Sequence, residues 1–256
     1  MGGVDTWSAS LQCAMKAIEV GKSLPQTLVL LHGMGTGASA WQPQLDALAD
    51  RFHVLAPFLP GYGQEPGPFT LEGASDVVVE LLNDRNASPV YVCGLSLGAL
   101  VALELARVHP RLVSRLVLSA GFVSIPEEHR APRVASAEAV RGFDPVAFSQ
   151  QVLPGLVNDV PEPHKEQALT EISGLTPAAV ANLIEMDFDA SSWIGELNMP
   201  TLVLCGDQAE VNLPLSRRLA ESLPNARFEL VPDAGHVANL DAPSAFTDAL
   251  LEFLVQ

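Results

Sequence analysis

Short runs of consecutive apolar residues recur along the chain and alternate with segments whose apolar positions repeat every three to four residues. The continuous runs are rich in Val and Leu, and they lie at residues 27–31, 54–56, 90–93, 116–118, 201–205 and 228–231. Uninterrupted runs of this kind are typical of parallel strands that helices cover on both faces. The periodic segments predict helices at residues 39–49, 71–83, 97–109, 214–222 and 243–254. This alternation predicts an α/β fold with a doubly wound, mostly parallel sheet, and residues 11–19 predict one further antiparallel strand.

The alternation stops between residues 125 and 192. This segment contains scattered prolines and helix-like stretches, but no strand pattern. Ligands of open α/β sheets bind at the carboxyl ends of the strands. We therefore predict a helical lid of residues 125–192, inserted between two strands of a core made of residues 1–124 and 193–256, with a pocket beneath the lid.

The charge of the chain narrows the choice of partners. Its 256 residues fit one large domain, and 30 acidic against 14 basic residues give a net charge of −16. Such a surface repels phosphate backbones and anionic headgroups, so we expect neither nucleic-acid nor membrane binding. No apolar stretch approaches the ~20 residues that span a bilayer, and the first residues lack the features of a signal peptide. We expect a cytoplasmic protein, and the three scattered cysteines predict neither a disulfide framework nor a metal site.

Gly94-Leu95-Ser96-Leu97-Gly98 is the strongest chemical signal in the sequence. It directly follows the strand at residues 90–93 and directly precedes a helix. A serine on such a turn adopts a strained backbone conformation that exposes its hydroxyl, and flanking side chains would clash with the strand and helix. The pattern predicts that Ser96 is a nucleophile.

A second glycine-rich turn, His32-Gly33-Met34-Gly35, ends the strand at residues 27–31. Such a turn directs a backbone N–H group into the pocket, so Met34 and Leu97 are the candidate donors of an oxyanion hole around Ser96. We interpret His32 itself as a structural histidine under this turn.

Asp233-Ala234-Gly235-His236 follows the strand at residues 228–231. A serine hydroxyl needs a base to take its proton, and an imidazole suits that role. A loop beyond a strand end lies at the same sheet edge as Ser96. His236 is therefore the predicted base.

These motifs, in this order, resemble the α/β-hydrolase superfamily from about residue 28 to the C-terminus. Further similarity lies in Trp41-Gln42-Pro43, Leu59-Pro60-Gly61-Tyr62-Gly63 and Leu240-Asp241-Ala242-Pro243. The chain is most similar to a short-lidded group that includes 3-oxoadipate enol-lactonases, pimeloyl-ester carboxylesterases and SHCHC synthases. The resemblance implies the α/β-hydrolase fold and a serine–histidine site, and it implies no metal or organic cofactor.

The resemblance also reveals a missing residue. Family members place the acid that orients the histidine three residues after the glycine that ends a strand; here that glycine is Gly206, and the acid position holds Ala209. Phe58 likewise stands where similar sequences carry an aspartate. Three explanations stay open. Ala209 and Phe58 are deliberate substitutions that leave a nearly inactive hydrolase, or Glu210 or Asp207 has taken over as the acid, or the reaction does not require a fully activated serine.

The predicted pocket is apolar. Its candidate residues near the sheet and in the lid are Met34, Phe58, Leu97, Phe122, Val237, Phe143, Phe148, Met186 and Phe188. This lining predicts a mostly hydrophobic small-molecule substrate with an acyl chain or a ring. Arg130, Arg133 and Arg141 are candidates for holding a substrate carboxylate, although solvated surface is the commoner role of such residues.

The leading hypothesis is a serine hydrolase of an ester, lactone or related acyl bond. One alternative is a lyase or cyclase that uses Ser96 and His236 as a proton relay without hydrolysis. Another is a receptor that binds a small molecule in the same pocket without turnover.

Overall fold

The computed structural model describes residues 17–63 and 68–256 of the chain. The strands are β1 (Ala17–Val20), β2 (Thr27–Leu31), β3 (His53–Pro57), β4 (Val90–Leu95), β5 (Val113–Ser119), β6 (Thr201–Gly206) and β7 (Ala226–Val231). The helices that alternate with them are η1 (Ala38–Trp41), α1 (Gln42–Leu48), α2 (Leu71–Asp84), α3 (Leu97–Val108), η3 (Ile194–Glu196), α9 (Asn212–Ser222), α10 (Ala238–Asp241) and α11 (Pro243–Leu254). The helices between β5 and β6 are α4 (Glu127–Arg141), α5 (Pro145–Ala147), η2 (Phe148–Val152), α6 (Leu153–Leu156), α7 (Glu162–Ile172) and α8 (Pro177–Glu185).

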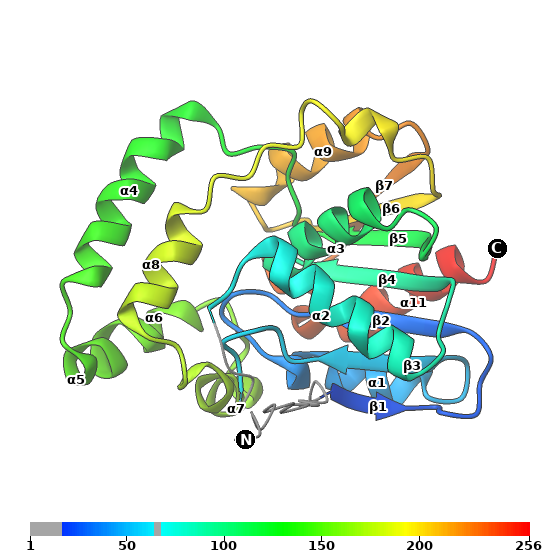
Figure 1. Cartoon of the computed structure of the whole chain (residues 1–256), viewed down its shortest axis with the longest axis horizontal. Helices are drawn as coiled ribbons and strands as arrows, with labels where there is room; N and C mark the ends of the chain where they lie inside the picture. Colours follow the sequence, from blue (N-terminus) through cyan, green and yellow to red (C-terminus); the bar gives the residue numbers. More distant parts are fainter. Residues whose placement is uncertain (1–16, 64–67) are drawn as a thin grey trace, which may run out of the picture.

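The strands form one seven-stranded sheet in the order β1-β3-β2-β4-β5-β6-β7. Only β1 is antiparallel to its neighbour, and all other pairs are parallel. Helices cover both faces: α2 and α3 lie in front of the sheet in Figure 1, and α1 and α11 lie behind it. Every residue of β2, β3 and β6 is buried, as a sheet covered on both faces requires. The predicted doubly wound α/β fold is confirmed.

Most of the strands are longer than predicted, and one prediction falls partly outside the described residues. The strand expected at residues 116–118 begins at Val113, because the half-buried Ser114 and Arg115 interrupt its apolar pattern. The antiparallel strand expected at residues 11–19 is present as β1, which starts at Ala17; residues 11–16 lie outside the described part of the chain.

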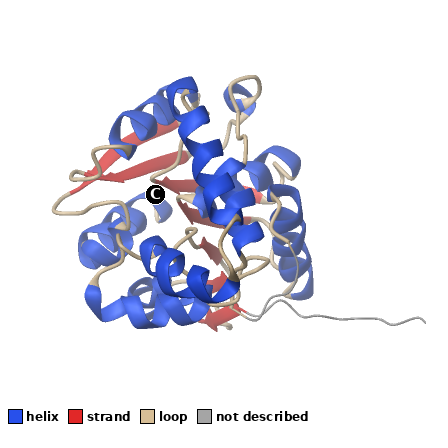
Figure 2. Cartoon of the chain, turned by 90° about the vertical axis from the view of Figure 1, so that its left-hand side faces the viewer, coloured by secondary structure: helices blue, strands red, loops and turns tan. Residues whose placement is uncertain are grey.

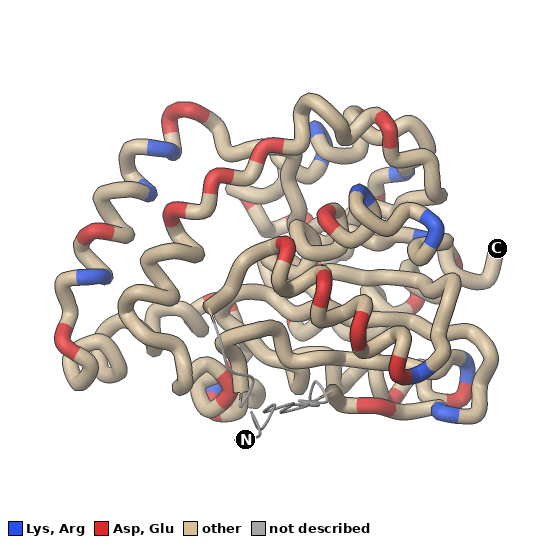
Figure 3. Tube along the Cα trace, viewed as in Figure 1, with Lys and Arg blue, Asp and Glu red and all other residues tan. Residues whose placement is uncertain are grey.

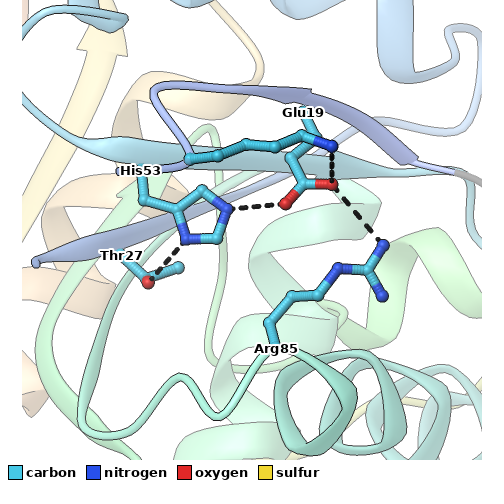
Figure 4. Close-up of polar contacts among 5 residues, drawn as sticks. Glu19, Thr27, His53 and Arg85 are labelled. Carbon is cyan, nitrogen blue, oxygen red and sulfur yellow. Dashed lines mark hydrogen bonds and ion pairs between the residues drawn. The ribbon is translucent and has the colours of Figure 1, made fainter. Parts of the chain in front are cut away.

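The edge strand β1 is attached to the sheet by a polar cluster around Glu19 (Figure 4). The carboxylate accepts a hydrogen bond from Nε2 of His53 at 2.8 Å, and the other ring nitrogen lies 3.3 Å from the hydroxyl of Thr27. Lys22 and Arg85 complete the cluster with ion pairs of 3.2 and 3.5 Å to Glu19. Burial alone raises the pKa of Glu19, but the hydrogen bonds and the nearby cations outweigh burial and lower it.

The helices α4 to α8 occupy the segment for which we predict a lid. Figure 2 views the molecule from their side, with the strands behind them. Where this segment leaves and rejoins the core, Ser124 and Asp189 form an isolated antiparallel bridge. Helices α4 and α8 pack along each other (Figure 1), and an ion pair between Arg141 and Glu185 ties them together.

Acidic positions are spread over most of the molecule, and α4 carries both acidic and basic positions (Figure 3). Within residues 17–63 and 68–256, no helix is both long enough and apolar enough to span a bilayer.

Candidate active site

Ser96 stands alone between the end of β4 and the first residue of α3. Its backbone has φ of 51°, in the left-handed region that non-glycine residues rarely adopt. The N–H of Ser96 donates to the carbonyl of Ser119 in the neighbouring strand at 2.8 Å. A side chain on Gly94 would overlap the backbone of Gly98, and one on Gly98 would overlap the carbonyl of Leu31. Both glycines are therefore required for the tight strand–turn–helix geometry that the sequence predicts.

Both predicted oxyanion-hole donors are close to Ser96, because Met34 lines a pocket with it and Leu97 directly follows it in the chain. Leu97 is the first residue of α3, so its N–H has no carbonyl partner within the helix. Within the described part of the chain, neither the Met34 nor the Leu97 N–H donates a hydrogen bond. Gly35, in the same turn as Met34, packs so closely on the carbonyl of Leu156 that a side chain would not fit. In the described residues, the N–H groups of Met34 and Leu97 are thus without hydrogen bonds, and α6 packs on the turn that carries Met34.

His32 lies beneath this turn and is completely buried. One ring nitrogen accepts a hydrogen bond from the N–H of Leu59 at 3.1 Å, and the other lies 3.0 Å from the carbonyl of Gly33. The ring packs edge-on against Tyr62, and burial lowers the pKa of His32 to about 4. Because both ring nitrogens of this neutral histidine contact backbone groups, His32 stabilises the turn and has no nitrogen free to accept a proton.

His236 lies in the loop after β7, at the same end of the sheet as Ser96. This loop packs so closely on the end of β6 that a side chain on Gly206 would overlap the carbonyls of Ala234 and Gly235. Nδ1 of His236 lies 3.0 Å from Oδ1 of Asn212, the first residue of α9. Since an amide oxygen only accepts hydrogen bonds, Nδ1 carries the proton and Nε2 keeps its lone pair. The ring is thereby held in the tautomer that a general base needs.

The electrostatic surroundings keep this histidine neutral. Burial is the largest influence on His236 and lowers its pKa below the ordinary value, while the negative charges of Asp159 and Asp241 partly offset that effect. Asp241 is fixed in turn, because its carboxylate accepts the N–H of Gly235 at 2.9 Å. Burial raises the pKa of Asp241. At neutral pH, the ring of His236 is therefore uncharged and able to accept a proton.

Neither of the two carboxylates proposed as substitutes for the acid is bonded to His236. Asp207 accepts a hydrogen bond from the backbone of Ala234 at 3.3 Å, and Glu210 is exposed. The structure does not bring either of them to Nδ1 of His236, which Asn212 occupies.

Asn212 is not among the predicted site residues, because the expected partner of His236 is a carboxylate. The available signal was a polar amide three residues beyond Ala209, at the start of a helix that follows a strand end. Ala209 is itself buried, and its carbonyl accepts the N–H of Asn212 at 3.0 Å, so this loop presents the asparagine to the histidine.

Ser96 opens onto two pockets. The smaller, of about 110 Å³, also contains Met34, Val237 and His236, together with Asp159 from the segment between β5 and β6. Within the described part of the chain, Ser96 and His236 share this pocket without a direct hydrogen bond, a separation that is common before substrate binds. The larger pocket, of about 400 Å³, contains Phe122 and Asn212.

Several of the predicted pocket residues lie away from Ser96. Phe58 lines a separate pocket of about 510 Å³, and its ring packs over Gly63. Met186 lines another, of about 230 Å³, beside the start of α2. The remaining aromatic residues pack in the hydrophobic core or against it, and they are Phe143, Phe148 and Phe188. The side chain of Leu97 is buried, and Leu97 lines neither of the two pockets that contain Ser96.

The fold and this arrangement of motifs define the class of protein. The chain matches the model of the alpha/beta hydrolase family over residues 28–249, and it belongs to that family. The resemblance predicted from the sequence is confirmed.

The relatives of the chain are hydrolases. It is 36% identical to a pimeloyl-[acyl-carrier protein] methyl ester esterase from Aromatoleum aromaticum, over 84% of this chain and 93% of that protein. It is 29% identical to RutD from Agrobacterium fabrum, a protein named provisionally as a carbamate hydrolase. The similarity covers 90% of this chain and 93% of that protein. It is 24% identical to 3-oxoadipate enol-lactonase 2 from Acinetobacter baylyi, over 96% and 94%. A solved hydrolase from Pseudomonas aeruginosa superimposes with a TM-score of 0.76 at 28% identity, over 90% of each chain.

Proposed function

We propose that this chain is a serine hydrolase that cleaves the ester bond of a small, mostly apolar substrate. The observation that carries the proposal is the pocket that Ser96 and His236 share, together with the contact from Asn212 that fixes the histidine tautomer. The strained backbone of Ser96 supports a nucleophilic role. Relatives named as a methyl ester esterase and a lactonase support attack at an ester carbonyl.

The reaction proceeds in two halves. In the first, Oγ of Ser96 attacks the carbonyl carbon while Nε2 of His236 takes the hydroxyl proton. The N–H groups of Met34 and Leu97 stabilise the oxyanion. The bond to the leaving oxygen then breaks, and His236 returns its proton to that oxygen, which leaves the acyl group on Ser96. In the second half, water gives a proton to His236 and attacks the acyl carbon. The bond from that carbon to Oγ of Ser96 then breaks, His236 returns the proton to Oγ, and the carboxylic acid is released.

Asn212 performs part of the role of a triad carboxylate. Its amide oxygen orients the ring of His236, as the asparagine of a Cys-His-Asn site does. It supplies no full negative charge to balance the imidazolium that forms during attack. Asp159 and Asp241 supply negative charge from a greater distance. We therefore expect turnover slower than that of a matched site with a carboxylate partner.

Labelling with a fluorophosphonate and hydrolysis of p-nitrophenyl butyrate test this function. Ser96→Ala should abolish labelling and lower kcat/KM by at least about 10³-fold. Ser149→Ala, at an exposed serine that bonds only the Val146 carbonyl, is the matched control and should change neither. A Ser96→Ala chain with full activity would refute the mechanism.

Hydrolysis in ¹⁸O-labelled water separates this proposal from a lyase or cyclase. A hydrolase places one labelled oxygen in the carboxylic acid that it releases. Products without the label, formed by an enzyme that still depends on Ser96 and His236, would instead indicate a proton relay.

A further inference from the structure

The larger pocket beside Ser96 lies between the end of the sheet and the helices α4 and α8. Its volume of about 400 Å³ is enough for a small organic chain, and most of its wall is apolar. The apolar side chains of this wall are Phe122, Ile125, Pro126, Pro132, Ile184, Val211 and Leu215. The polar residues that line the same pocket are Ser96, Ser124, His129, Ser136, Asn212 and Arg133, the last of which comes from α4.

Arg133 differs from the other arginines of its helix. Arg130 pairs with Asp187 at 2.6 Å, and Arg141 pairs with Glu185. Among the residues that the structure describes, Arg133 has neither an ion pair nor a hydrogen bond from its side chain, although the chain carries 30 acidic residues against 14 basic ones. The acidic side chains that neutralise α4 are thus arranged around its two ends and leave its middle cation unpaired.

The position of Arg133 makes this lack of a partner unfavourable. The residue is half-buried against an apolar wall, and burial lowers its pKa below the ordinary value for arginine. A cation that is partly removed from water is stabilised when a bound anion replaces the lost hydration. Its planar guanidinium is suited to a carboxylate, which it binds through two parallel hydrogen bonds.

We propose that Arg133 binds a carboxylate of the substrate, so that the preferred ester is a monoester of a dicarboxylic acid whose chain fills this pocket. The proposal rests on the function proposed for Ser96, which opens onto the same pocket. Arg133 is the only Arg or Lys among the described residues that line it, which matches a singly charged carboxylate better than a dianionic phosphate. The role of Arg133 is to determine specificity, and the chemistry stays with Ser96 and His236.

Monomethyl esters of glutaric, adipic, pimelic and suberic acids test the proposal. Each is compared with the neutral methyl ester in which the free carboxyl is a primary amide, an isostere of nearly the same shape. At the best chain length, the parent should show kcat/KM at least about 10-fold higher for the acid than for the amide. Arg133→Gln should lower kcat/KM for the acid by about 10-fold or more and leave the amide within about threefold. Arg130→Gln is the matched control on the same helix and should preserve the preference for the acid.

Binding provides a readout that does not depend on turnover. In the Ser96→Ala background, calorimetric titration should show tighter binding of the best monomethyl ester than of its amide, and Arg133→Gln should abolish that difference. Equal binding of acid and amide, or an equal loss of both in Arg133→Gln, would overturn the role of Arg133. The proposed function survives that result if Ser96 still reacts with fluorophosphonate and the neutral esters are still hydrolysed. If Ser96 is unreactive but the acid still binds through Arg133, the hydrolase proposal fails and the carboxylate site remains.

Discussion

Two histidines of this protein are held by side-chain oxygens at opposite places in the sheet, and their partners differ in charge. At the β1 edge, His53 is bonded to the carboxylate of Glu19, and its second nitrogen is engaged by Thr27. At the carboxyl end of the strands, His236 is bonded to the amide of Asn212. Its second nitrogen has no hydrogen bond within the described part of the chain.

The difference separates a structural histidine from one that is free to react. When protein groups satisfy both ring nitrogens, the ring joins strands and has no site left for a proton from a substrate. When one nitrogen is held and the other faces a pocket, the same ring is oriented and remains able to accept a proton. The protein thus places a charged partner where it stabilises the fold and a neutral partner where the chemistry is proposed to occur.

The largest expected effect comes from removing each ring in turn. His236→Gln should lower kcat/KM for p-nitrophenyl butyrate by about 10³-fold or more, because the serine loses its base. His53→Gln should leave kcat/KM within about threefold but lower the thermal midpoint, since it disrupts the β1 cluster. Activity and melting measurements on both variants test the contrast. An inactive but fully stable His53→Gln chain would contradict this assignment.

The second effect concerns the carboxylate at the β1 edge. Glu19→Gln should lower the free energy of unfolding at pH 7 by about 1.5–3 kcal/mol, because it replaces a charged hydrogen-bond acceptor with an amide. The exposed Glu252, whose nearest cation is 3.7 Å away, supplies the control, and Glu252→Gln should change stability by less than about 0.5 kcal/mol.

The pH dependence of that effect has a defined sign. The pKa of Glu19 is lowered in the folded protein, so the unfolded chain takes up its proton at higher pH. The stabilisation is therefore complete above about pH 5 and is lost as the pH falls through about 4.3, the ordinary Glu value, and then through the lower folded pKa. Denaturant unfolding from pH 7 to 3 should show the parent and Glu19→Gln converging. A difference in stability that stays constant to pH 3 would mean that the charge of Glu19 contributes nothing.

These features differ in how far the sequence predicts them. The strands and the Ser96 turn are predictable because their causes are local: continuous apolar runs, and glycines that leave room for a strand to meet a helix. The Asn212–His236 pair is a contact between two loops that follow different strands. The sequence does not predict it, because the expected partner of the histidine is a carboxylate and an amide oxygen accepts the same hydrogen bond. The position of Phe58 after β3 predicts a place at the active site, but its ring packs over Gly63 and lines another pocket.

The smallest expected effect comes from giving His236 a carboxylate partner, like the one that His53 has. Asn212→Asp should raise kcat/KM at pH 8 by about 10-fold, or ~1.4 kcal/mol, because a negative charge stabilises the imidazolium formed during attack. Activity requires neutral His236, whose pKa lies below the ordinary 6.5 in the parent, so the acid limb of kcat/KM against pH should have its midpoint below 6.5. A carboxylate raises that pKa and should move the midpoint to higher pH.

Two further variants decide whether Asn212 is the partner that matters for His236. Asn212→Leu keeps a similar volume but removes the acceptor, so it should lower kcat/KM by about 10-fold as the histidine loses its fixed tautomer. Ala209→Asp places a carboxylate at the position that family members use. One outcome is that Ala209→Asp raises kcat/KM and shifts the acid limb, while Asn212→Asp changes neither. The functional acid position is then 209, and the amide of Asn212 only orients the ring of His236. If Asn212→Asp produces both changes, the acceptor position has moved along the β6–α9 loop, and the amide there is what limits the rate.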